Sequence, residues 1–163
     1  MAYIKGSGMT KISTCKDISL LRGLIKEWRD ECLADDFGIV IDMEEVEKDF
    51  IDTMKGRNSA MLLMTCDDYE NDSPAGFIGI RMFKNPLGHE MIANEHYWFV
   101  GKQYRGRRSI YLLNAAKDWA KINGCKLFMS NASCLASRLH DQVCALYENT
   151  GMKKFETTYI MQI

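Results

Sequence analysis

The chain has 163 residues, 47% of them hydrophobic, which fits one domain with a buried core. A formal net charge of −1 gives no general attraction to nucleic acids or anionic membranes. No apolar run approaches the roughly 18 residues of a membrane span, and no secretion signal is recognisable at the start. The six scattered cysteines and three histidines have no metal-ligand spacing, so we expect reduced thiols, no metal site and a cytoplasmic protein.

The first third of the chain predicts a short strand followed by two helices. Residues 1–8 (MAYIKGSG) are interpreted as a candidate flexible leader, which leaves 9–163 as the domain. Asp17 precedes apolar residues at helical spacing, so a helix is expected over 18–33. Asp42 and Glu45 have the spacing of a capping pair for a second helix that stops near Gly56.

The remainder predicts alternating strands and helices. Three antiparallel strands with short polar turns, including one at 67–74, are expected first. A helix, a strand, a further helix and a closing strand follow. The strands are expected at 60–66, 75–83, 90–100, 125–130 and 153–163, and the helices at 109–123 and 138–149. The order β-α-α-β-β-β-α-β-α-β predicts a single α/β domain around a mixed sheet.

A cationic stretch lies between the 90–100 strand and the following helix. In FVGKQYRGRRSI, four cations surround Gly106: Lys102, Arg105, Arg107 and Arg108. A loop that enters a helix N-terminus presents unpaired N–H groups and the positive end of the helix dipole, which favour phosphate. Arginine adds bidentate contacts, and glycine permits close approach of the backbone. The segment predicts a pyrophosphate-binding loop, with a solvated cationic loop as the alternative.

The run VGKQYRGRRSIYLLNAAKDWAKINGCKLFM resembles the acetyl-coenzyme A loop of the GNAT superfamily of N-acetyltransferases. The residues that follow the family's order are Val100, Arg105, Gly106, Leu112, Leu113, Trp119, Ala120 and Gly124. Downstream, ALYENTGMKKFETTY resembles the family's last helix and closing strand, with Tyr147 and Gly151 matching. Upstream, NEHYWFV resembles a subgroup often encoded by bacteriophages. The later glycines of the family loop are absent, because Arg108, Ser109 and Ile110 replace them.

The resemblance implies the GNAT fold, a mixed and mostly antiparallel sheet flanked by helices. It also implies transfer of an acetyl group from acetyl-CoA to a primary amine by direct attack. Pantetheine would pair with the 90–100 strand where that strand splays from 126–131, and the pyrophosphate would lie at the cationic loop. The residues expected to bind the cofactor are Trp98, Phe99, Val100, Arg105, Gly106, Arg107, Arg108, Ser109 and Asn131. For Asn131, a plain turn is the alternative.

Two residues are the candidate catalytic groups. Glu95 is expected to act as the base, through water, with a solvent-facing strand glutamate as the alternative. His96 is its rival, and strand alternation places His96 on the opposite face, with Trp98 and Val100. Tyr147 is expected to act as the acid that protonates the departing thiolate, with a half-buried core tyrosine as the alternative.

The acceptor is expected to be an amine. Acidic residues in 28–56 favour a cationic small molecule or a protein lysine, although a solvated helix face explains them equally well. A homodimer is left open. Two other function classes compete: a non-catalytic acyl-CoA-binding or structural protein of the same fold, which the missing glycines favour, and a nucleic-acid-binding module that uses the Lys102–Arg108 patch, which the net charge disfavours.

Overall fold

The computed structural model describes residues 2–3, 9–68, 71–133, 139–156, 158 and 161. Within them, six strands form one sheet in the order β1-β2-β3-β4-β5-β6. Neighbouring strands are antiparallel except β5 and β6, which are parallel. The strands are β1 (Ala2–Tyr3), β2 (Thr10–Thr14), β3 (Ser59–Asp68), β4 (Asn71–Lys84), β5 (Met91–Val100) and β6 (Cys125–Met129). This confirms the predicted mixed, mostly antiparallel sheet.

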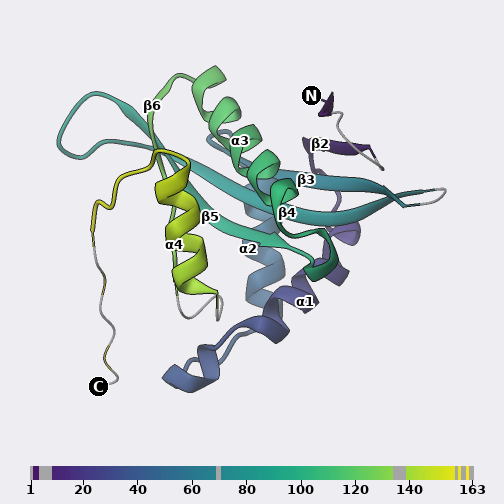
Figure 1. The fold of residues 1–163 in the computed structure, drawn as a ribbon. Coiled ribbons are helices and arrows are strands. Elements are labelled where there is room, and N and C mark those ends of the chain that lie inside the picture. The colour runs from purple at the N-terminus through teal and green to yellow at the C-terminus, as the bar shows by residue number, and fades with distance from the viewer. Residues whose placement is uncertain are drawn as a thin grey trace.

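In the described part of the chain, four α-helices cover the two faces of the sheet (Figure 1). They are α1 (Arg22–Glu31), α2 (Met43–Lys55), α3 (Arg107–Ile122) and α4 (His140–Asn149). Short 3-10 helices occupy Ile18–Leu20, Ala34–Phe37 and Lys102–Tyr104. The two helices α1 and α2 lie behind the sheet in this view, and α3 and α4 lie in front. No helix in the described residues is long and apolar enough to cross a membrane.

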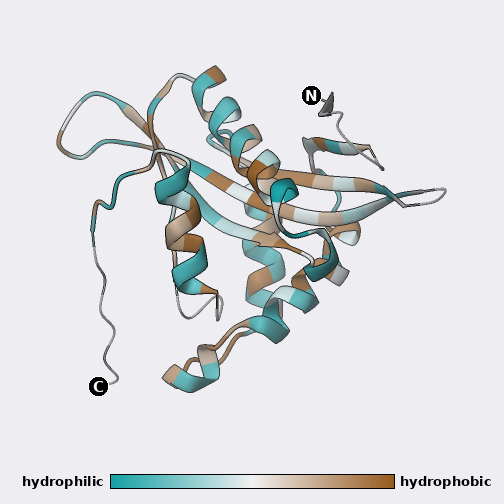
Figure 2. Cartoon of the chain, in the orientation of Figure 1, coloured by the Kyte–Doolittle hydropathy of each residue, from teal (hydrophilic) through white to brown (hydrophobic). Residues whose placement is uncertain are grey.

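Side-chain alternation along the strands builds one hydrophobic cluster on each face. On one face, Leu62, Ile78 and Ala93 pack against Leu112 and other residues of α3. On the other face, Phe77 and Phe99 form a cluster with residues of α1 and α2 that include Ile25 and Phe50. Figure 2 shows the hydrophobic strand residues enclosed between the helices. Burial of these apolar faces is the main force that fixes the layers.

The helix caps follow the sequence closely. Asp42 Oδ1 accepts hydrogen bonds from the backbone N–H groups of Glu44 and Glu45, at 2.9 and 3.3 Å, and α2 starts at the next residue. Asp17 accepts from the Ser19 N–H, but it caps the 3-10 turn that precedes α1. The helix predicted over 18–33 is therefore divided into that turn and the shorter α1.

Two predictions outside the core are wrong. The polar segment predicted as a turn over 67–74 is largely strand, because β3 and β4 continue their pairing to Asp68 and Asn71. The closing strand predicted over 153–163 is absent from the residues described there, 153–156, 158 and 161. Lys153 to Glu156 are exposed, and Phe155 is 83% exposed, so no buried face holds this stretch against the sheet.

A β-bulge in β5 decides which side chains share a face. The register pairs Gly79 with Tyr97 and Ile80 with Glu95, which leaves His96 without a partner on β4. The extra residue shifts the alternation by one position. Glu95 therefore shares a face with Trp98 and Val100, towards α3 and α4. His96 lies opposite Glu95, as predicted, but the prediction that Trp98 and Val100 share the face of His96 is wrong.

Candidate functional site

The pairing of β5 with β6 stops partway along β5. Their parallel pairing runs from Met91 and Cys125 to Asn94 and Met129, and β5 then continues to Val100 with β4 as its partner. Beyond Asn94, the side of β5 that faces away from β4 has no strand partner among the described residues. Such an edge offers backbone groups to an extended ligand. This is the splay that the sequence resemblance implied.

A buried pair of catalytic candidates lies at the start of this splay. The Tyr147 hydroxyl, on α4, donates a hydrogen bond of 2.8 Å to Glu95 Oε2. Glu95 is 5% exposed and Tyr147 is 8% exposed. The structure therefore brings the two predicted residues into direct contact, and the alternative of a solvent-facing Glu95 is wrong.

Asn131, two residues after β6, ties this pair together. Its backbone N–H donates to Glu95 Oε2 at 3.3 Å, and its side-chain Nδ2 donates to the Glu95 backbone oxygen at 3.3 Å. The Tyr147 hydroxyl also lies 3.5 Å from the Asn131 carbonyl oxygen. The side chain predicted to contact the cofactor is thus engaged with Glu95, and it spans the gap where the strands part.

The two groups have strongly perturbed acidities. Burial raises the pKa of the Glu95 carboxyl from its ordinary 4.5 to about 7, although hydrogen bonds from the Tyr147 hydroxyl and the Asn131 N–H oppose the rise. Burial and the neighbouring Glu95 carboxylate raise the pKa of the Tyr147 phenol well above its usual range. At neutral pH the site therefore combines a carboxyl poised near half ionisation with a phenol that keeps its proton.

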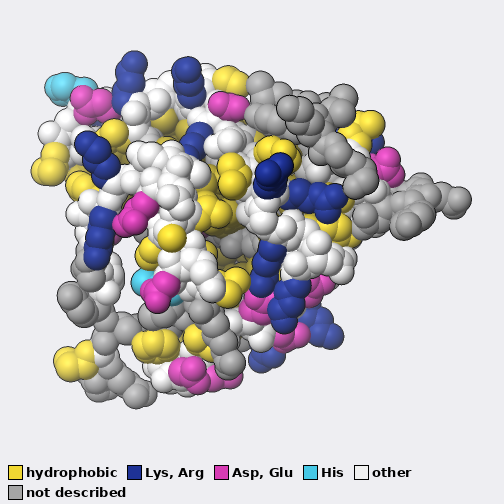
Figure 3. Space-filling model, viewed as in Figure 1, with side chains coloured by type: hydrophobic (Ala, Val, Ile, Leu, Met, Phe, Trp, Pro, Cys, Tyr) yellow, Lys and Arg dark blue, Asp and Glu magenta, His cyan; other side chains and the backbone are white. Residues whose placement is uncertain are grey.

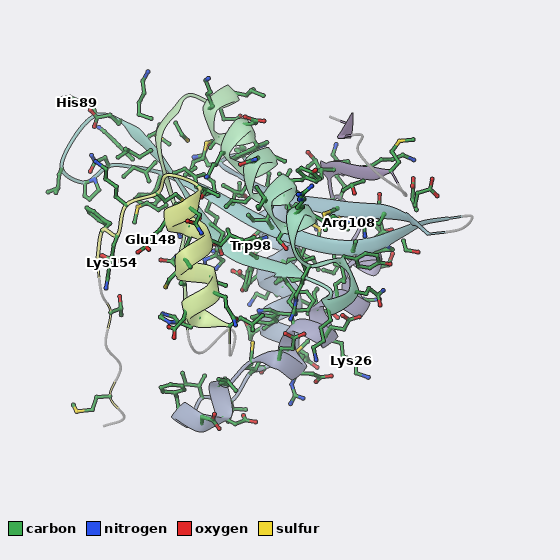
Figure 4. All side chains as sticks on the ribbon, in the orientation of Figure 1. Lys26, His89, Trp98, Arg108, Glu148 and Lys154 are labelled. Carbon is green, nitrogen blue, oxygen red and sulfur yellow. The ribbon has the colours of Figure 1, made fainter. Side chains whose placement is uncertain are left out.

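Trp98 covers this pair and carries a free donor. Its ring stacks on Tyr147 with centroids 5.7 Å apart. The buried indole Nε1–H has no hydrogen-bond partner in the part of the chain that the structure describes. A buried donor of this kind is costly unless a ligand or water satisfies it. Figure 4 shows Trp98 between α4 and α3.

The cationic segment is divided between the 3-10 helix Lys102–Tyr104 and the first turn of α3. Gly106 has a φ of 97° and caps the helix, so α3 starts at Arg107, two residues earlier than predicted. The first turn carries Arg107 and Arg108 and no acidic residue. Cations are unfavourable at the positive end of a helix dipole unless an anion is bound there. Ser109 is buried, and its N–H bonds to the Gly106 carbonyl oxygen at 3.0 Å.

The surface around this turn is strongly basic. Figure 3 shows Lys and Arg side chains gathered near the N-terminal end of α3, beside a hollow between α3 and α4 with hydrophobic side chains on its walls. Arg108, whose guanidinium lies 5.7 Å from the centre of the Tyr104 ring, is labelled there in Figure 4. Trp98, which stacks on Tyr147, lies between the same two helices in Figure 4, so the acid–base pair and the basic turn lie on the same side of the sheet as this hollow.

Arg105 is held by protein groups. Its Nη2 lies 2.7 and 2.6 Å from the two carboxylate oxygens of Glu31, and its Nε donates to the Val100 carbonyl oxygen at 2.9 Å. The guanidinium also lies 5.6 Å from the centre of the Phe99 ring, whose side chain belongs to the opposite hydrophobic cluster. The pairing of Glu31 with Arg105 is not predictable from local sequence patterns, because the two residues are 74 positions apart in the chain.

His96 belongs to a separate network on the α2 side of the sheet. Its Nε2 lies 3.3 Å from Asp49 Oδ2, which also accepts the Tyr97 hydroxyl at 2.9 Å. Burial and the nearby Arg81 guanidinium lower the pKa of His96. Glu95 faces α4 and His96 faces α2, so the rival base lies on the opposite face of the sheet from Tyr147.

Comparisons with known proteins identify the family and the fold. The family described as Acetyltransferase (GNAT) family matches residues 24–152. An aminoglycoside N-acetyltransferase in complex with CoA is 14% identical over 99% of both chains, with a TM-score of 0.73. A ribosomal-protein-alanine N-acetyltransferase from Brucella melitensis biovar Abortus 2308 is 14% identical over 94% of this chain and 99% of that chain, with a TM-score of 0.67. A transcriptional regulator from Bacillus halodurans C-125 is also 14% identical, over 94% of this chain and 99% of that chain, with a TM-score of 0.73. No curated protein matches the chain. At these identities the structures show a shared fold.

Proposed function

Because the chain belongs to the acetyltransferase (GNAT) family, we propose that it transfers an acetyl group from acetyl-CoA to a primary amine by direct attack. The observation that carries the proposal is the buried Glu95–Tyr147 hydrogen bond of 2.8 Å at the splay of β5 and β6. Carboxyl groups with a pKa raised to about 7 are concentrated at functional sites, and this one lies where the free edge of β5 begins.

The residues at the hollow fit acetyl-CoA. Arg107, Arg108 and the N–H groups of the first turn of α3 would hold the pyrophosphate, and an anion there would offset the charge of that turn. The free edge of β5 near Trp98 and Val100 would pair with the amides of pantetheine. The thioester supplies an activated acyl group when it is bound.

Glu95 is the proposed base. An ordinary lysine amine has a pKa of about 10.4 and must lose a proton before it attacks. A carboxyl group whose pKa is about 7 accepts protons far better near neutral pH than an exposed glutamate does. Because Glu95 is buried, a water molecule would carry the proton to it from the amine.

Tyr147 is the proposed acid. Its phenol keeps its proton at neutral pH and gives it to the departing thiolate, and its hydroxyl lies against Glu95, which returns to the phenolate the proton that it took from the amine. The Asn131 N–H and side chain hold Glu95 in place. Asn131 is thus proposed as a positioning residue, in place of its predicted contact with the cofactor.

The acceptor is proposed to be a cationic amine, either a small molecule or a protein lysine. The support is the acidity of α1, α2 and the segment between them, which includes Asp30, Asp35 and Asp36. Membership of a bacteriophage-encoded subgroup stays a prediction, and the chemistry does not depend on it.

A thiol-release assay tests the proposal. Acetyl-CoA is incubated with the protein and with a panel that contains a polyamine, a lysine peptide and a peptide with a free N-terminus. We expect amine-dependent release of free coenzyme A with at least one acceptor. Binding of coenzyme A without release for any amine would instead favour a non-catalytic acyl-CoA-binding protein.

A further inference from the structure

Arg105 and Glu31 connect two distant segments at the basic end of the hollow. Glu31 is the last residue of α1, and Arg105 is the last residue before the Gly106 cap of α3. Both carboxylate oxygens of Glu31 lie within 2.7 Å of Arg105 Nη2. The side chains are only 19% and 28% exposed, so water screens the ion pair less than at an open surface.

The same guanidinium also fixes the chain on the other side of the loop. Arg105 Nε donates to the carbonyl oxygen of Val100, the last residue of β5. One side chain therefore joins the end of β5, the end of α1 and the start of α3. Because Gly106 follows directly, with a φ of 97°, this anchoring sets the direction in which the first turn of α3 presents its N–H groups and its arginines.

We propose that Glu31 is a positioning residue for acetyl-CoA: it holds Arg105, and through Arg105 it holds the loop that binds the pyrophosphate. This inference rests on the proposed function. Arg105 then acts through the shape of the loop, and the phosphate contacts fall to Arg107, Arg108 and the backbone. A loop held in its binding geometry before the ligand arrives loses less entropy on binding.

The direction in which one substitution changes the Kd for coenzyme A distinguishes this proposal from charge repulsion alone. A carboxylate near an anionic ligand repels it, so removal of the Glu31 charge without a positioning role would tighten binding. If Glu31 positions the loop, Glu31→Gln weakens coenzyme A binding, and we expect the Kd to rise about tenfold. Calorimetric titration with coenzyme A measures the Kd directly.

Glu27 supplies the matched control. Glu27 lies one turn earlier in α1 and is exposed. It is also close to the same loop, because a Cβ atom built on Gly101 would lie 3.4 Å from Glu27 Oε2. Glu27→Gln removes the same charge near the same loop without touching Arg105, so its Kd should equal or fall below the wild-type value. A Glu31→Gln protein that melts like the wild type and binds as tightly as Glu27→Gln would overturn the proposal.

Exchanging the charges of Glu31 and Arg105 tests whether Arg105 acts through its ion pair with Glu31 or through direct contact with the phosphate. The double variant Glu31→Arg with Arg105→Glu should bind coenzyme A more tightly than Arg105→Glu alone, because the pair is restored in reverse. If Arg105 instead turns to the phosphate on binding, the double variant will bind as weakly as the single variant, and the proposal fails.

Failure of the proposed function would look different. A wild-type protein that does not bind coenzyme A would remove both the function and the positioning role. The ion pair itself would still be visible in melting temperatures, because Glu31→Gln and Arg105→Gln should then be non-additive in the double variant. Additive melting shifts would contradict the structural pair on which the inference depends.

Discussion

At Glu95, burial raises the pKa of the carboxyl group and hydrogen bonds lower it. Burial dominates and raises the pKa from 4.5 to about 7, which corresponds to about 3 kcal/mol between the two protonation states. The folded protein therefore holds this proton to a higher pH than the unfolded chain does. Between about pH 4.5 and pH 7 the folded state binds more protons, so its stability falls as the pH rises.

Glu95→Gln should abolish that part of the pH dependence. Below pH 4.5 the carboxyl group is neutral in both states, and the wild type has its full stability from this site. Above pH 7 the wild type must bury a charge that the variant lacks. We expect the melting temperature of Glu95→Gln, relative to the wild type, to rise between pH 4.5 and pH 8, with exposed Glu148→Gln as a flat control. A constant difference across this range would contradict the raised pKa.

Tyr147→Phe should separate chemistry from binding. The ring and its stacking on Trp98 remain, so folding and coenzyme A affinity should stay within a few-fold of the wild type. Loss of a positioned acid should lower turnover by about 100-fold. Loss of its hydrogen bond, which holds the pKa of Glu95 down, should also move the acid limb of the kcat/KM profile to higher pH.

Tyr97→Phe is the matched control for that substitution. Tyr97 lies on β5, the strand that carries Glu95, and its hydroxyl donates to the Asp49 carboxylate on the opposite face of the sheet. The turnover of this variant should remain close to the wild-type value. Equal turnover in both phenylalanine variants would remove the acid role from Tyr147.

The residues that sequence reasoning placed on the wrong face, relative to Glu95, are Trp98 and Val100. Strict alternation along 90–100 puts Glu95 and Trp98 on opposite faces, and a single unpaired residue at the bulge reverses that result. The choice of Glu95 and Tyr147 followed from the family resemblance, whereas their mutual hydrogen bond could not, because it joins residues 52 positions apart. The Glu31–Arg105 ion pair escaped prediction for the same reason.

Among the elements, α3 illustrates how charge and conformation combine. Its N-terminal turn holds Arg107 and Arg108 where the helix dipole disfavours cations, while its last turn holds Lys121, where the dipole favours one. An arrangement that costs stability in the free protein is expected where a bound anion offsets the cost. The solvated-loop alternative gives no reason for this placement.

Arg108→Ala should therefore weaken binding of coenzyme A. Loss of one charge-assisted contact, about 1.5–3 kcal/mol, would raise the Kd by about ten- to a hundredfold. Lys121→Ala removes the same charge from the other end of the same helix, and it should leave the Kd unchanged. If both substitutions had equal effects in calorimetric titrations, general attraction by positive charge would explain the binding, and the site would not lie at the first turn.

Element boundaries were predictable where a local signal fixes them. Asp42 and Gly124 mark the start of α2 and the end of α3, because one caps backbone N–H groups and the other takes a φ of 81°. The segment 67–74 was not predictable, because pairing with a neighbouring strand outweighed its turn composition. The strand predicted around Phe155 is absent although the local residues favour a strand, because they bury no face against the sheet.

Across the whole molecule, the sheet and its two hydrophobic clusters bring distant segments to one hollow. The strand order runs in sequence order, and the only parallel neighbours, β5 and β6, are the pair that parts at Asn94 among the described residues. The layer arrangement was readable from periodicity and the order of elements. The contents of the hollow depend on tertiary contacts between Glu95, Asn131 and Tyr147, which periodicity does not encode.

The most direct test of the central claim is to follow the acetyl group itself. Acetyl-CoA that carries an isotope label in the acetyl group is incubated with the protein and the best amine of the panel, and the amine is analysed by mass spectrometry. We predict that the label appears on the amine nitrogen, in proportion to the free coenzyme A released, and that Tyr147→Phe slows its appearance about 100-fold. Release of coenzyme A with the label found only in acetate, or no transfer to any amine, would contradict the account.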